Sequence, residues 1–63
     1  MNISEGQKLI KSKEYAKALT YFLDLKKKNV NITIIYFYLG LIYFEFNKFN
    51  KSIFYYNKFL KKE

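Results

Sequence analysis

The chain has 63 residues, 12 of them lysine, five acidic residues, and no histidine, cysteine or arginine. This length allows one small domain, residues 1–63, without a deep active-site cavity. The absent residue types exclude disulfides, thiolate metal sites and the usual general base. An apolar content of 51% excludes intrinsic disorder.

Apolar residues recur three or four positions apart throughout a chain without proline, which predicts helices. In chain order we expect four, at residues 3–12, 15–28, 32–46 and 49–62. The side chain of Asn31 is expected to cap the third helix, and Asn47 to end it in the left-handed conformation. The expected inward stripe of the second helix is Tyr15, Ala18, Leu19, Phe22 and Leu25, and that of the fourth is Phe49, Ser52, Ile53, Tyr56 and Phe59.

The chain also resembles itself when its first half is aligned with its second. The alignment that places Gly6 on Gly40, the only two glycines, also matches the two inward stripes residue for residue. We call this alignment the repeat register. Most matched pairs share chemical type and few share identity. A period of about 34 residues indicates two repeated units, about 1–31 and 32–63.

Each glycine lies inside a predicted helix, where it costs up to about 1 kcal/mol relative to alanine. Close helix packing would explain this cost. We therefore expect Gly6 to face Ala18, and Gly40 to face Ser52, so that the two helices of each unit approach closely.

These residues resemble the tetratricopeptide repeat, a pair of antiparallel helices with the same period. The second unit carries the resemblance best, and the first fits from Gly6 onward; the matching residues are Leu9, Tyr15, Ala18 and Phe22, then Tyr36, Leu39, Gly40, Tyr43, Phe49, Ser52 and Tyr56. The resemblance implies an all-α fold of two antiparallel helix hairpins stacked as a short α-solenoid.

The chain departs from the family pattern at several positions. Asn2 and Glu5 replace a large residue and a leucine of the first helix, which predicts a frayed or truncated helix there. Val30 stands where the family has proline, so we expect a looser turn or a continuing helix. Leu25 and Phe59 replace a small residue, which would alter the superhelical angle or mark faces that pack against something else.

The resemblance implies a non-enzymatic module or scaffold that binds a protein or peptide through a groove lined by the first helix of each unit. The groove is largely apolar, so the expected ligand is an apolar or amphipathic segment. A competing interpretation is that neighbouring helices or a second copy cover these residues. The groove residues would be Ile34, Phe37, Tyr38, Leu41, Phe44 and Glu45, with Ile3, Gln7, Ile10 and Lys11.

The fourth helix carries more apolar side chains than so small a chain can bury by itself. Two outcomes would resolve this excess: a further helix of a longer solenoid, or association of copies, for which we expect a twofold dimer. The predicted self-association face is Ile53, Phe54, Tyr56, Phe59 and Leu60.

Nucleic-acid binding is the alternative function, because lysines interleaved with aromatic residues can pair phosphate contacts with base stacking. The lysines come with many asparagine, isoleucine, phenylalanine and tyrosine residues, whose codons are all A/T-rich, so genome composition explains much of the net charge of +7. We therefore expect nucleic acid to be an unlikely partner.

We expect no enzyme activity, metal or cofactor, because no two acidic residues share a helical spacing and no histidine can activate a serine. The first fifteen residues lack the apolar run of a signal peptide. The apolar run at 32–46 is too short to span a bilayer. These observations predict a cytoplasmic protein without a membrane span.

Overall fold

The computed structural model describes residues 3–61 and contains the four predicted helices. They are α1 (Ile3–Lys11), α2 (Tyr15–Lys27), α3 (Ile32–Glu45) and α4 (Phe49–Lys61). Each begins at the predicted residue, and the first three end one residue early; Lys62, the predicted end of the fourth, lies outside the described range. The residues after α1, α2 and α3 still donate to the carbonyl four positions back, so they are caps. The all-α fold is confirmed.

All three links between the helices close in the same way. A left-handed residue follows each helix, with φ of 59–61°, and the next backbone N–H donates to the carbonyl five positions back, as in a Schellman motif. The three donors and acceptors are Glu14 to Leu9 (2.8 Å), Val30 to Leu25 (3.1 Å) and Lys48 to Tyr43 (2.9 Å). The left-handed residues are Lys13, Asn29 and Asn47.

Asn47 therefore ends α3 as predicted. A helix continuing through Val30 was one of the two expectations for that link, and it is wrong: the link is a hydrogen-bonded turn. The predicted side-chain cap at Asn31 is also wrong. Asn31 precedes α3 but its backbone is left-handed, with φ 45°, and its side chain makes no capping hydrogen bond. A side-chain cap needs extended backbone at this position.

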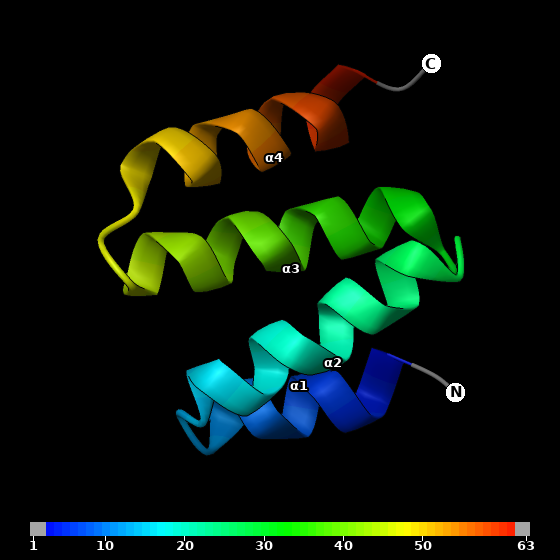
Figure 1. Ribbon diagram of the computed structural model, residues 1–63, viewed down its shortest axis with the longest axis vertical. Coiled ribbons are helices and arrows are strands. Elements are labelled where there is room, and N and C mark those ends of the chain that lie inside the picture. Colours follow the sequence, from blue (N-terminus) through cyan, green and yellow to red (C-terminus); the bar gives the residue numbers. More distant parts are fainter. Residues whose placement is uncertain (1–2, 62–63) are drawn as a thin grey trace.

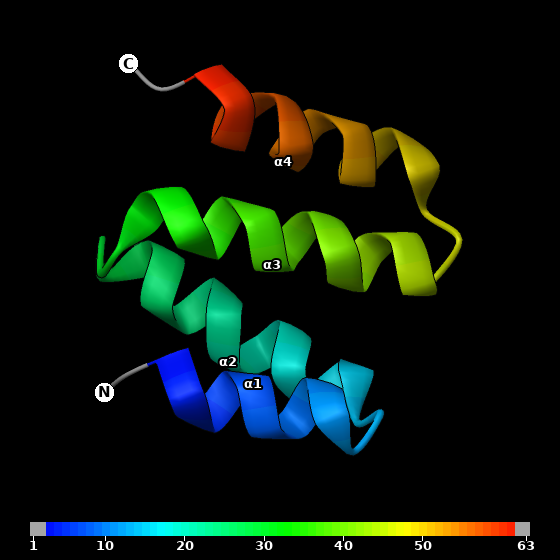
Figure 2. The same ribbon diagram turned by 180° about the vertical axis from the view of Figure 1, so that it is seen from behind.

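The helices stack in the order α1, α2, α3, α4, each packed on the next (Figures 1 and 2). The molecule measures 29 × 26 × 16 Å. The described residues form two antiparallel hairpins, and α1 and α2 overlap in the view down the shortest axis (Figure 1). Both views place α4 at one end of the stack, with α3 on only one side of it.

The core lies between α2 and α3. Its fully buried apolar residues come from these two helices alone: Ala18, Phe22, Leu25, Ile35, Leu39 and Ile42. Helix α3 is apolar almost all round because it packs on α2 with one face and on α4 with another. Leu25, one of the bulky departures from the family pattern, is part of this core.

Both glycines are buried at close helix contacts, but an aromatic ring on the facing helix makes each contact. An added Cβ at Gly6 would collide with the ring of Phe22, and one at Gly40 would lie 2.7 Å from Cδ1 of Tyr56. The expected neighbour Ser52 does face Gly40, because its hydroxyl donates to the Gly40 carbonyl at 2.8 Å. The two rings lie four positions after the expected small residues. They occupy the space that a side chain at Gly6 or Gly40 would fill, so they explain the two glycines best.

None of the helices within residues 3–61 is both long enough and apolar enough to cross a bilayer.

Candidate interaction surface

Large exposed apolar side chains are concentrated in the second unit. Within residues 3–61 they are Phe44, Phe46, Phe49, Ile53, Phe54 and Leu60, each 38–65% exposed. Phe49, Ile53 and Leu60 recur at helical spacing on one face of α4, and the ring of Phe44 lies 5.4 Å from that of Phe49. We call Phe44, Phe49, Ile53 and Leu60 the apolar end surface.

The first unit shows why this surface is exposed. Tyr15 and Leu19, which the repeat register matches with Phe49 and Ile53, pack against the core. Helix α3 covers them; the ring of its C-cap Phe46 lies 6.5 Å from that of Tyr15. No helix within the described range covers α4 in this way. The prediction that Phe49 and Ile53 face inward is therefore wrong: they are 50% and 57% exposed.

The predicted groove residues of α3 separate into covered and open positions. The ring of Phe37 lies 5.3 Å from that of Phe59 and 6.0 Å from that of Tyr56, so α4 covers part of it. Tyr38 stacks on Phe22 at 5.0 Å. Ile34 and Leu41 are half-buried, whereas Phe44 and Glu45 are exposed.

The four predicted groove residues of helix α1 divide into two that pack on the core and two that are exposed. Ile3 and Ile10 pack against the core, and Gln7 and Lys11 are exposed. The side chain of Gln7 donates a hydrogen bond to the hydroxyl of Tyr38, so the structure joins these two predicted groove residues across α1 and α3. The open part of the predicted surface is accordingly the α3 side, from Ile34 through Leu41 to Phe44.

The predicted self-association face lies on two sides of α4. Tyr56 and Phe59 are half-buried against Phe37. Ile53, Phe54 and Leu60 are exposed, but Phe54 stands about 100° around the helix from Ile53 and contacts Tyr55 and Lys58. Phe49 completes the Ile53 side. The sequence carries no separate sign that Phe49 is exposed. Its counterpart Tyr15 is partly buried by α3, and comparing the two residues would have helped only if that contact had been known.

Tyrosine and lysine side chains cluster between α3 and α4. Tyr55 stacks on Tyr43 at 5.7 Å and on Tyr36 at 6.0 Å. The Nζ atoms of Lys51 and Lys58 lie 5.3 and 5.6 Å from the ring centroids of Tyr43 and Tyr36, in cation–π geometry. Burial, followed by the neighbouring tyrosines, raises the pKa of Tyr55 above 10.0. These ring faces are used within the molecule.

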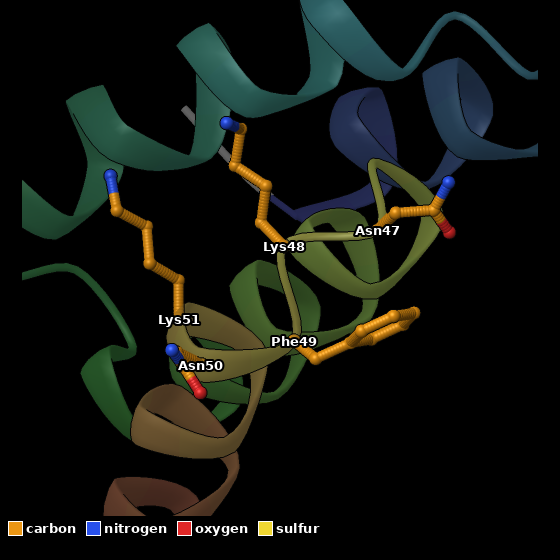
Figure 3. A pocket seen from close by; sticks show the side chains of 5 residues that line it. All are labelled: Asn47, Lys48, Phe49, Asn50 and Lys51. Atoms are coloured by element: carbon orange, nitrogen blue, oxygen red, sulfur yellow. The ribbon is translucent and has the colours of Figure 1, made fainter.

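A shallow depression at the turn between α3 and α4 is lined by residues 47–51 (Figure 3). Lys48 and Lys51 extend to one side of the turn and the ring of Phe49 to the other. The lining offers two ammonium groups, two amides and a phenyl ring, without a carboxylate or imidazole.

No group of residues in the described part of the chain could hold a metal ion. Comparison with protein-family models, with curated proteins and with solved structures gave no match to this chain.

Proposed function

We propose that this protein is a non-enzymatic protein–protein interaction module of the tetratricopeptide-repeat kind, which binds an apolar or amphipathic segment of a partner. The exposure of the apolar end surface carries the proposal. Phe44, Phe49, Ile53 and Leu60 are exposed, whereas their counterparts in the first unit, Ile10, Tyr15, Leu19 and Lys26, are all half-buried. Large apolar surfaces on small proteins are typical of docking sites.

The repeat resemblance supports the same proposal. Helices α2 and α4 span 15–27 and 49–61, and α1 and α3 end at 11 and 45, so these bounds all keep the repeat register. Gly6 and Gly40 meet rings that the same register matches with each other. The open part of the predicted groove, on α3, indicates the ligand class. Ile34, Leu41 and Phe44 offer apolar area there, and Glu45 adds a charge beside it. Such a face recognises a segment by shape and buried area.

A designed amphipathic helical peptide tests the proposal. A fluorescent peptide with leucine at positions i, i+4, i+7 and i+11 is titrated with the protein and followed by anisotropy, with a scrambled peptide as reference. Phe44→Lys is expected to weaken binding at least about tenfold, because an exposed ring of this size contributes roughly 1.5–3 kcal/mol when buried. Phe54→Lys is the matched control, since both rings are 54% exposed. Equal binding of the designed and scrambled peptides would contradict the proposal.

Nucleic-acid binding is the second candidate, favoured by Lys48, Lys51 and the exposed Phe49 at one turn. We rank it lower because Lys51 and Lys58 already lie over tyrosine rings, and Lys17 and Lys28 form ion pairs with Glu14 and Asp24 at 3.3 and 3.1 Å. Titration of a single-stranded oligonucleotide decides between the two. Binding tighter than about 1 μM at physiological salt, lost in Lys48→Ala/Lys51→Ala, would reverse the ranking.

A further inference from the structure

The outward faces of α1 and α4, at opposite ends of the stack, differ in polarity. Helix α3 covers α2 with Leu39, Ile42 and, just beyond its end, Phe46. The residues that the repeat register matches with these three, on and just beyond α1, are Glu5, Lys8 and Ser12, which are exposed. The α1 of one copy therefore cannot cover the α4 of another as α3 covers α2, because charged groups would be placed against the apolar side of α4. Head-to-tail stacking of copies is disfavoured.

The exposed side of α4 is complementary to itself. Phe49, Ile53 and Leu60 are exposed, and Tyr56, which is half-buried against α3, lies between the last two. Together they form one stripe with spacings of four, three and four residues. This series reads the same in both directions, so an antiparallel second copy places Phe49 opposite Leu60 and Ile53 opposite Tyr56, about a dyad midway along the helix. A twofold axis buries the same patch on both copies and closes the assembly.

Two of the three lysines of α4 point away from this stripe. Lys51 and Lys58 lie over the rings of Tyr43 and Tyr36 of α3, away from the stripe. A second copy on the stripe thus meets the apolar side chains without contacting these ammonium groups. The net charge of +7 per chain acts only at longer range, where salt screens it.

We infer that the occupant of the apolar end surface is a second copy of this chain, paired antiparallel through α4. The inference rests on the proposed function, because it assigns one of the surfaces on which that function depends. Phe44, Phe49, Ile53 and Leu60 expose roughly 400 Å² per copy, about half the ~800 Å² that each partner buries in a standard interface. The dimer is accordingly weak, with a dissociation constant on the order of micromolar.

Sedimentation equilibrium over a range of concentrations tests the dimer. The wild-type chain is expected to show a reversible monomer–dimer equilibrium that strengthens from low salt to about 0.5 M salt as the like charges are screened. Ile53→Lys should weaken association at least about a hundredfold, because the dimer contains the position twice. Phe54→Lys, at nearly equal exposure on another side of α4, should change it less than about threefold. A monomeric wild-type chain, or equal loss in both variants, would overturn the inference.

Single-cysteine variants test the orientation, because the chain has no native cysteine. A mixture of Phe49→Cys and Leu60→Cys chains should form a mixed disulfide on oxidation, whereas Phe49→Cys alone should not. In the antiparallel pair the two copies of residue 49 lie about eleven residues, or roughly 16 Å, apart along the helix. Efficient cross-linking of Phe49→Cys to itself would show a parallel pair and overturn the inference.

The peptide titration, run on wild-type chain diluted well below the dimer dissociation constant, separates this inference from the proposed function. A chain that stays monomeric at every concentration and binds the peptide overturns the dimer and keeps the function. A chain that dimerises when concentrated but binds no peptide when dilute supports the dimer and removes the peptide-binding claim.

Discussion

Helices α2 and α4 have matched sequences and matched bounds, yet only α2 is fully packed. Ala18, Phe22 and Leu25 are completely buried, whereas of their counterparts Ser52, Tyr56 and Phe59 only the serine is buried. The difference comes from neighbours: α2 lies between α1 and α3, and α4 has α3 on one side. A repeat unit thus specifies its own helices, and the next helix determines how much of them is buried.

The largest expected effect compares the two matched rings. Phe22→Ala should destabilise the fold by about 3–5 kcal/mol, because it removes a fully buried aromatic ring. Tyr56→Ala should cost about half as much, since its ring is partly exposed. Urea unfolding followed by circular dichroism measures both. Equal losses would show that exposure does not distinguish the two units.

The glycines give a second, smaller comparison. Gly6→Ala should destabilise by about 1–3 kcal/mol, because the new methyl group collides with the fully buried ring of Phe22. Gly40→Ala should be closer to neutral, because the ring of Tyr56 is not fully buried and can move, and alanine gains up to about 1 kcal/mol in helix propensity. The thermal unfolding midpoints of the two variants measure this difference. A larger loss of stability in Gly40→Ala than in Gly6→Ala would contradict the prediction.

The corresponding turns of the two units differ in the residue that is left-handed. Lys13→Gly should stabilise the protein by about 0.5–1 kcal/mol, because lysine is strained in a left-handed backbone that glycine adopts freely. Asn47→Gly should change stability by only a few tenths of a kcal/mol, since asparagine tolerates this conformation. Chemical denaturation of the two variants side by side checks the order; a larger gain at Asn47 would contradict it.

The smallest effect concerns alkaline pH and two tyrosines of the second unit. Burial raises the pKa values of Tyr55 and Tyr56, with nearby Tyr43 and Tyr36 adding for the first and Glu45 for the second. The unfolded chain therefore loses these protons at lower pH than the folded one, and stability falls as pH rises above about 10. Tyr55→Phe/Tyr56→Phe should flatten this decline in unfolding measured between pH 9 and 11, and a decline as steep as that of the wild type would contradict the prediction.

The helices were largely predictable because their signals are local. Apolar spacing located all four starting residues, and Asn47 carried a recognisable left-handed preference at the end of α3. The all-α class and the close contacts at Gly6 and Gly40 followed from the same local pattern and the repeat register.

The errors arose where the outcome depends on neighbours or on backbone geometry. Phe49 and Ile53 match Tyr15 and Leu19 in type, so the repeat register alone placed both inward. Only the excess of apolar residues on the fourth helix marked Ile53 as exposed, and it did not mark Phe49. Asn31 has a residue type suited to capping, but its left-handed backbone prevents it. The choice of Phe22 and Tyr56 as glycine partners depends on which way each ring turns, which spacing alone does not specify.

The ordering of the stack, in which each helix packs mainly on the one before and after it in the chain, has a kinetic consequence. Contacts between residues near in sequence require little loop closure, so this topology belongs to the fast-folding class of helical proteins, with relaxation in microseconds to milliseconds. It also lets α4, which packs on α3 at the end of the stack, open while the core between α2 and α3 stays formed. Amide hydrogens of α4 should therefore exchange with solvent sooner than those of α2.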